Sequence, residues 1–172
     1  MQSYFNRNIA NTVTLINIIL GSLSLVNTMA GNYRMSAVLI LFAVIMDGMD
    51  GRLARRLDST SDLGKQLDSL CDLVSFGVAP ALLIYDQVFL ANGMVTGIFW
   101  FLLFISCGAY RLARFNVLNI TTHFVGIPIT LTGCLMAIIS LLATEISPGV
   151  VAILVASLAI LMVSTIKVRK FK

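Results

Sequence analysis

The sequence predicts an all-α membrane protein that crosses the bilayer several times, and its composition is the first reason. Hydrophobic residues make up 58% of the 172-residue chain and charged residues only 12%, whereas soluble domains carry about 25% charged residues. The mean hydropathy is +0.94. A soluble core of this size cannot hide so much apolar surface, so the apolar segments are expected to lie in a membrane. Because the connectors are short, we expect a single domain covering residues 1–172.

Six apolar segments are predicted to be transmembrane helices. Residues 1–10 are mixed in polarity and predict a short interfacial helix before the first span. Pro80 falls inside the third span, where a membrane helix tolerates it as a kink, and a connector is expected from Asp86 to Gly93. The expected spans are 12–30, 35–46 (continuing as a polar helix to 56), 63–85, 94–116, 127–145 and 150–166.

Basic residues are distributed unequally between the two ends of these spans. Six spans put both termini on one side, and that side then holds every lysine and arginine except Arg34. Basic residues concentrate in cytoplasmic loops. The protein is therefore predicted to be integral to the cell membrane, with both termini and the polar helix ends on the cytoplasmic side.

Most of the acidic residues lie on that same side, between positions 47 and 72. Asp47 and Asp50 are three residues apart and Asp68 and Asp72 four apart, and both spacings place a pair on one face of a helix. Four converging carboxylates repel one another unless cations neutralise them. Oxygen ligands without His or Cys suit Mg²⁺, Mn²⁺ or Ca²⁺ rather than zinc. Two such cations, about 3.5–4 Å apart, can clamp the oxygens of a phosphoryl displacement.

Two residues between the acid pairs suit a phosphate ligand. Gly51 leaves the helix surface bare for a ligand to approach, and Arg55, one turn further, offers a guanidinium fork. An alternative is that the first acid pair only forms ion pairs with Arg55 and Arg56 at a solvated helix end. That alternative does not explain a second acid pair in a helix that enters the membrane.

The aspartates belong to a longer pattern that resembles the signature of the CDP-alcohol phosphotransferase family. The resemblance implies that family's fold across nearly the whole chain, two divalent cations (Mg²⁺ or Mn²⁺) and a homodimer. It also implies that Asp47, Asp50 and Asp68 bind the cations, while Asp72 acts as general base and contacts one of them. The matching positions are Asp47-x2-Asp50-Gly51-x2-Ala54-Arg55-x8-Gly64-x3-Asp68-x3-Asp72.

The same resemblance implies a set of contacts to the CDP moiety. Gly51, Arg55 and the region of Ser61 would hold the nucleotide. Many family members carry Pro-Asn-x-x-Thr before the first span. Here the proline is missing, but Asn11 and Thr14 are retained and are expected to contact the nucleotide.

Three further blocks are similar to the phosphatidylserine synthase branch of the family: residues 72–81, 111–116 and 124–128. This similarity implies transfer of a phosphatidyl group from CDP-diacylglycerol to L-serine, with membrane lipid as surroundings and CMP as the second product. Arg111 and Arg114 lie three apart at the cytoplasmic end of the fourth span and can present a cationic pocket to a carboxylate or a phosphate. With Asn116 they are the expected acceptor contacts, although arginines there can also anchor the helix to lipid headgroups.

Other functions remain open at this point. The acceptor can instead be glycerol 3-phosphate or an inositol phosphate, with the arginines binding its phosphate. A membrane cation transporter would show repeated halves or acids near mid-membrane in several spans, whereas these acids lie on two helices at one side. A structural membrane protein would tolerate replacement of Asp68. The chain carries no nucleic-acid motif, and no nucleic-acid partner is expected.

Overall fold

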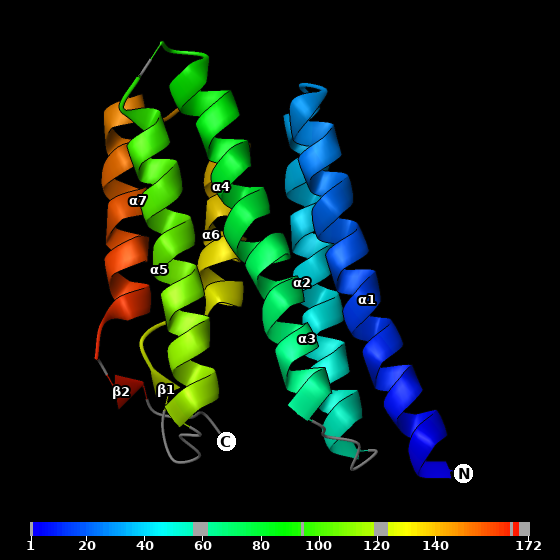
Figure 1. Ribbon diagram of the computed structural model, residues 1–172. Coiled ribbons are helices and arrows are strands. Elements are labelled where there is room, and N and C mark those ends of the chain that lie inside the picture. Colours follow the sequence, from blue (N-terminus) through cyan, green and yellow to red (C-terminus); the bar gives the residue numbers. More distant parts are fainter. Residues whose placement is uncertain (1, 57–61, 94, 119–123, 166, 169–172) are drawn as a thin grey trace.

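Long helices that run along a common axis form the protein (Figure 1). The computed structural model describes residues 2–56, 62–93, 95–118, 124–165 and 167–168, with side chains at 12–49, 62–93, 95–117 and 126–165. Two π-helical segments, η1 (Leu73–Val78) and η2 (Tyr85–Leu90), extend the third helix of the chain. The α-helices are α1 (Gln2–Met29), α2 (Tyr33–Arg56), α3 (Asp62–Asp72), α4 (Ala79–Ile84), α5 (Gly97–Leu118), α6 (Ile129–Leu141) and α7 (Pro148–Val163).

The described segments confirm the prediction of an all-helical chain with long apolar helices. Three segments are long and apolar enough to cross a membrane: Thr12–Met29, Asp62–Leu90 and Gly97–Val117. The apolar helices α6 and α7 have 13 and 16 residues. At 1.5 Å per residue they span about 20 and 24 Å, less than the hydrocarbon core of about 30 Å. The count of six spans therefore stays a prediction.

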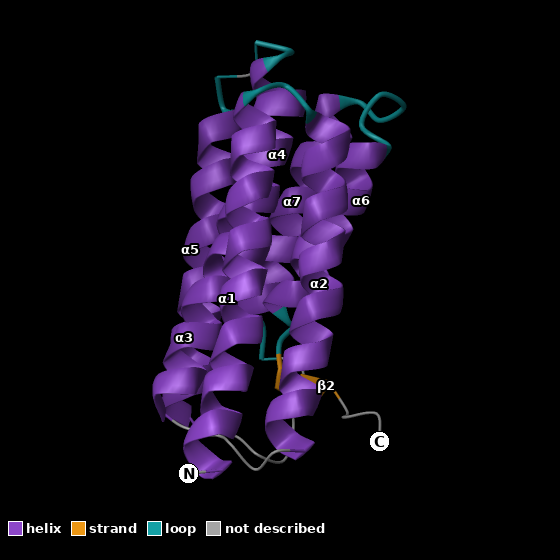
Figure 2. Cartoon of the chain, turned by 90° about the vertical axis from the view of Figure 1, so that its right-hand side faces the viewer, coloured by secondary structure: helices purple, strands orange, loops and turns teal. Residues whose placement is uncertain are grey.

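The only strands in the described part of the chain are two residues long. β1 (Phe124–Val125) pairs antiparallel with β2 (Lys167–Val168), with Phe124 opposite Val168. Figure 2 shows this pair towards the lower end of the bundle, where α1, α2 and α3 extend further down than the strands. It joins the segment before α6 to the segment after α7.

Residues 2–10 do not form the separate interfacial helix predicted from their mixed polarity. They are the first part of α1, which runs without a break from Gln2 to Met29. The reason is that no glycine or proline precedes Gly21, so nothing in the backbone interrupts the helix between the mixed and the apolar stretch.

The third predicted span continues beyond residue 85, where a connector was expected. Asp86 lies in η2, and the hydroxyl of Tyr33 donates a hydrogen bond to its Oδ2 at 3.1 Å, which compensates the carboxylate for its position in a helix. Pro80 lies between the two π-helical segments. The N–H of Ala79 bonds to the carbonyl oxygen of Val74, five residues back. This wider turn accommodates a residue that has no N–H.

The hairpin of α1 and α2 sets the position of the polar helix ends. Near the turn, the buried hydroxyls of Ser24 and Thr28 lie 2.7 and 2.6 Å from that of Ser36. These bonds between buried groups oppose a shift of one helix along the other. The end of α2 and the beginning of α3 consequently lie at the same end of the bundle as the start of α1 and the end of α7 (Figures 1 and 2).

Candidate active site

Three of the four predicted metal-binding aspartates converge at this polar end of the bundle. Asp47 comes from α2, and Asp68 and Asp72 come from α3. One carboxylate oxygen from each lies within 4.8 Å of the others. The spacing of four residues places Asp68 and Asp72 on one face of α3, and the packing of α2 brings Asp47 to that face. Asp72 is the most buried of the three, with 8% of its surface exposed.

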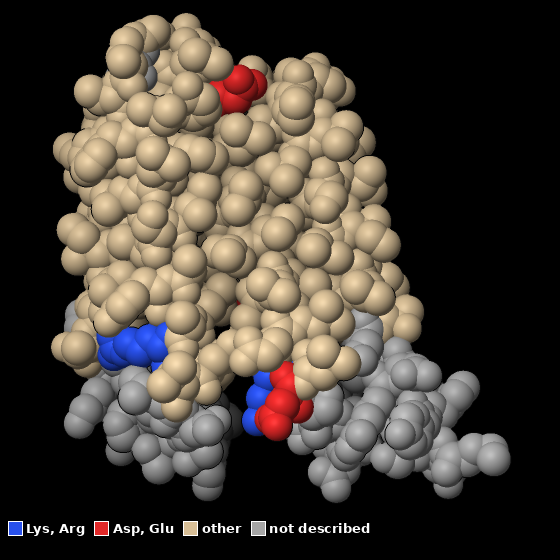
Figure 3. Space-filling view, in the orientation of Figure 1, with Lys and Arg blue, Asp and Glu red and all other residues tan. Residues whose placement is uncertain are grey.

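The aspartates form one wall of a cavity of about 570 Å³. Its other walls come from α5 and from the start of α6, so four helices contribute to it. On the face shown in Figure 3, the described charged side chains lie towards the two ends of the molecule, with an uncharged band between them. The cavity is lined by Asp47, Asp62, Lys65, Gln66, Asp68, Ser69, Asp72, Arg111, Leu112, Phe115, Asn116, Pro128 and Thr130.

Neighbouring polar groups modulate the charge of these carboxylates. Asp47 lies just beyond the apolar part of α2, where burial raises the pKa of its carboxyl group while hydrogen bonds with Thr130 and Asp72 act in the opposite direction. Thr130 Oγ1 donates to Asp47 Oδ2 at 3.2 Å. Arg111 brings a positive charge close to Asp72, and its guanidinium carbon lies 5.9 Å from the centre of the Phe115 ring.

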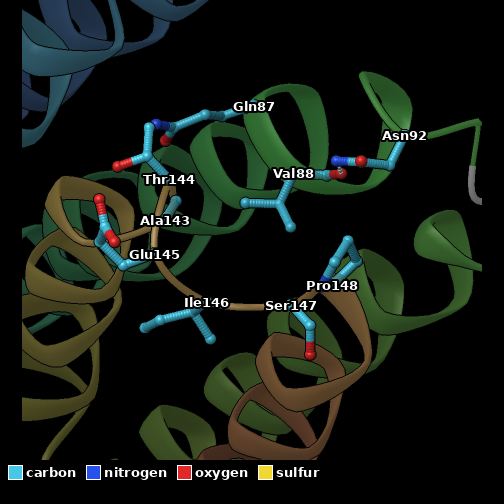
Figure 4. A pocket seen from close by; sticks show the side chains of 9 residues that line it. All are labelled: Gln87, Val88, Asn92, Ala143, Thr144, Glu145, Ile146, Ser147 and Pro148. Carbon is cyan, nitrogen blue, oxygen red and sulfur yellow. Dashed lines mark hydrogen bonds between the residues drawn. The ribbon is translucent and has the colours of Figure 1, made fainter.

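A second described cavity, of about 420 Å³, lies at the other end of the bundle. Figure 4 shows that its lining side chains come from η2, from Asn92 shortly after η2, and from the connection between α6 and α7 up to Pro148. Glu145 is its one acidic residue, and no lysine or arginine is among the residues that line it. Of these two cavities, only the one with the aspartates offers both clustered anionic ligands and a cation for a phosphate.

Comparison with known proteins identifies the family. Residues 7–166 match the family model described as CDP-alcohol phosphatidyltransferase, a stretch that contains the three converging aspartates. The chain belongs to the CDP-alcohol phosphatidyltransferase family. The resemblance seen in the aspartate pattern is thereby confirmed.

Curated relatives within the CDP-alcohol phosphatidyltransferase family cover most of the chain. A CDP-diacylglycerol–serine O-phosphatidyltransferase of Methanocaldococcus jannaschii is 38% identical over 165 residues, which is 95% of this chain and 74% of that protein. One of Bacillus subtilis with the same name is 37% identical over 161 residues, 93% of this chain and 89% of that protein. An archaetidylserine synthase of Methanothermobacter thermautotrophicus is 34% identical over 162 residues, 90% of this chain and 66% of that protein.

CDP-alcohol phosphatidyltransferases depend on divalent metal ions in general, and the cavity fits such ions. The donors are carboxylate oxygens, and neither His nor Cys is among the residues that line the cavity. Such a ligand set suits Mg²⁺ or Mn²⁺. Asp50, the fourth predicted ligand, follows Asp47 by three residues on the described backbone of α2, but its side chain lies outside the described residues.

The predicted acceptor contacts separate in the structure. Arg111 and Asn116 both line the cavity. Asn116 Nδ2 donates to Ser69 Oγ at 3.0 Å and to Gln66 Oε1 at 3.4 Å, linking α5 to α3. Arg114 is not among the residues that line the cavity.

Arg114 instead donates from Nη1 to the carbonyl oxygen of Val163 at 3.1 Å. Val163 is the last residue of α7, and the last carbonyls of a helix have no partner within it. Arg114 lies almost one turn further along α5 than Arg111, and its side chain reaches the end of α7 instead of the cavity. The contact joins α5 to the end of α7.

Most of the predicted nucleotide contacts fall where the structure gives no side chain. Thr14 is buried in α1, with 7% of its surface exposed, and is not among the residues that line the cavity. The side chains of Asn11 and Arg55 lie outside the described residues, as does Ser61 entirely, and Gly51 is described only as part of the α2 backbone.

Three uncharged polar residues of the cavity, Gln66, Ser69 and Thr130, were missed in the sequence. Gln66 and Ser69 lie three apart in α3 and hence on a common face, a spacing from which they were predictable once Asn116 was placed opposite. Thr130 carried no such signal, because nothing in the sequence relates it to Asp47, 83 residues earlier.

Proposed function

We propose that this protein transfers the phosphatidyl group of CDP-diacylglycerol to the hydroxyl of L-serine and releases CMP. The observation that carries the proposal is the convergence of Asp47, Asp68 and Asp72 in one cavity with Arg111 and Asn116. The names of the relatives from M. jannaschii and B. subtilis agree with this reaction.

The cavity offers groups that suit both substrates. The aspartate wall is anionic and suits the pyrophosphate of the liponucleotide together with cations. Arg111 can pair with a carboxylate, and its Nε is buried without a hydrogen-bond partner among the described residues. Asn116, Gln66 and Ser69 are neutral groups whose oxygens can accept from an ammonium group. A free amino acid carries both of these charges.

In the proposed reaction, the serine hydroxyl oxygen attacks the phosphorus that carries the diacylglycerol. A new P–O bond forms to serine, and the P–O bond to CMP breaks with its electron pair staying on CMP. Asp72 accepts the hydroxyl proton, and general-base help of this kind contributes about 10²- to 10⁴-fold. Two Mg²⁺ or Mn²⁺ ions held by Asp47, Asp50, Asp68 and Asp72 would neutralise the phosphate oxygens.

The remaining parts of the site follow from the family pattern. Gly51, Arg55, Ser61, Asn11 and Thr14 are proposed to hold the CDP moiety. The acyl chains would lie between helices within the bilayer.

The proposal also places the active site and both termini on the cytoplasmic side. Basic residues cluster at that end of the predicted spans, as they do in cytoplasmic loops. The homodimer implied by the family pattern is part of the proposal, and cross-linking of the protein in native membranes tests it.

An acceptor panel is the direct test of this function. Purified protein in detergent micelles receives CDP-diacylglycerol with Mg²⁺ or Mn²⁺ and, separately, L-serine, glycerol 3-phosphate or an inositol phosphate. We expect CMP and phosphatidylserine to form when the acceptor is L-serine, and no CMP with the other two acceptors. Release of CMP with a phosphorylated acceptor and not with serine would assign Arg111 to an acceptor phosphate instead. The absence of CMP with every acceptor and both cations would refute the transferase.

A cation transporter is the alternative from another class. It predicts metal uptake into proteoliposomes without CMP chemistry. The three clustered aspartates argue against it, because they lie at one end of the bundle and come from two neighbouring helices, whereas transport sites lie near mid-membrane.

A further inference from the structure

Thr130 contacts the aspartate cluster from a helix that the family signature does not include. Its Oγ1 donates a hydrogen bond to Asp47 Oδ2 at 3.2 Å, and its side chain lines the same cavity. No acidic or basic side chain accompanies it on α6. A hydroxyl that donates to a ligand carboxylate fixes which way the carboxylate faces and leaves less freedom to be lost when a cation binds.

The start of α6 is packed tightly against its neighbours, so the hydrogen bond from Thr130 restricts the orientation of the Asp47 carboxylate. Ile129, next to Thr130, is fully buried, and its Cδ1 lies 2.8 Å from where a Cβ on Gly108 would be. A larger residue than glycine in α5 would therefore displace it. The N–H of Ile127 donates to the carbonyl oxygen of Leu161 at 3.2 Å. The segment that carries Thr130 is thus fixed to both α5 and α7.

We propose that Thr130 is a positioning residue for the metal site, holding the Asp47 carboxylate in the orientation that binds a divalent cation. The inference rests on the metal-dependent part of the proposed function and is independent of the acceptor. Its described hydrogen bond goes to Asp47, so removal of the hydroxyl should alter cation affinity first.

A second threonine on the same helix provides a matched control. Thr132 is fully buried, and its hydroxyl donates to the carbonyl oxygen of Ile129 at 2.9 Å. It is not among the residues that line the cavity. T130V and T132V make the same chemical change two residues apart, but only the first removes a hydrogen bond to an aspartate.

Binding of Mn²⁺ in the absence of substrate tests the inference. Purified wild-type protein, T130V, T130S and T132V in detergent micelles are titrated with Mn²⁺, and the free ion is followed by electron paramagnetic resonance. We expect T130V to raise the half-saturating Mn²⁺ concentration by about 10- to 100-fold, the range typical of groups that orient metal ligands. T130S keeps the donor and should bind like the wild type, as should T132V. T130A, which removes the same hydroxyl, replaces T130V should that variant not fold.

Three results would overturn the inference, and they are distinguishable. Equal Mn²⁺ affinity in T130V and the wild type would refute the positioning role and leave the proposed function intact. An equal loss in T130V and T132V would trace the effect to the packing of α6. If the wild type binds no Mn²⁺ and added Mg²⁺ does not increase CMP release, both the metal site and the proposed function are refuted.

Discussion

Replacing Arg111 by glutamine tests how the cavity recognises its acceptor. Arg111 lines the cavity beside Asp72, while Arg114 on the same helix donates to the carbonyl oxygen of Val163. Both arginines are half-buried, so the two substitutions are comparable in type and setting. The R111Q variant removes the charge from the cavity, and R114Q removes a contact at the end of α7.

The size of the expected effect follows from the bond that would be lost. A hydrogen bond to a charged partner contributes about 1.5–3 kcal/mol, and each 1.4 kcal/mol corresponds to about a tenfold change in binding. The KM for L-serine should therefore rise about 10- to 150-fold in R111Q. R111K keeps the charge but not the planar fork, so an intermediate rise is expected.

Steady-state CMP release in mixed micelles measures the effect. L-serine and CDP-diacylglycerol are varied in turn, and thermal unfolding of each variant is followed in parallel. For R111Q we expect a higher KM for serine, little change in KM for CDP-diacylglycerol and an unchanged unfolding midpoint. For R114Q we expect a lower unfolding midpoint and an unchanged KM for serine.

Two outcomes would contradict this reasoning. A rise in KM for CDP-diacylglycerol alone in R111Q would mean that Arg111 binds the liponucleotide phosphate. A rise in KM for serine in R114Q without loss of thermal stability would return Arg114 to the acceptor site and remove the distinction between the two arginines.

Three further predictions concern the metal site and the far end of the bundle. D72N should lower kcat about 10²- to 10⁴-fold, the usual contribution of a general base. D68N should lower kcat further and also raise the Mn²⁺ concentration needed for half-maximal CMP release. An equal dependence on Mn²⁺ in the two variants would contradict this division of roles. Treatment with EDTA should abolish CMP release, and added Mg²⁺ or Mn²⁺ should restore it, whereas activity that survives chelation would exclude a metal-dependent displacement. Y33F removes the hydrogen bond to Asp86 and should destabilise the protein by about 0.5–1.5 kcal/mol, read as a lower unfolding midpoint with unchanged kcat. A lower kcat in Y33F with an unchanged unfolding midpoint would contradict this prediction, because it would mean that the Tyr33 end of the bundle affects the active site.

Local sequence was sufficient for much of the site because helix periodicity is a local property. Asp68 and Asp72 share a face of α3 by their spacing alone, and the neutral pair of Gln66 and Ser69 follows the same rule. The apolar segments and the uneven distribution of basic residues are likewise visible along the chain. These features depend on neighbours within a few residues, so the sequence carries them without knowledge of packing.

The helix boundaries were less predictable, since polar residues do not always end a membrane helix. Asp86 suggested a connector, yet the backbone continues as η2 because Tyr33 and Ser140 bond to the side chains of Asp86 and Gln87. Both partners are about 53 residues away in sequence. The helix is therefore extended by contacts that exist only after folding.

By itself, the sequence determined that this is a helical membrane protein with a family signature of aspartates, because composition and spacing act within single helices. Only the tertiary structure decided that Thr130 bonds to Asp47, that Asn116 faces Ser69, and that Arg114 contacts Val163 rather than the cavity. Each of these pairs joins two helices. Apolar helix faces of similar composition do not specify which of them meet, so these contacts follow from the packing of the bundle as a whole.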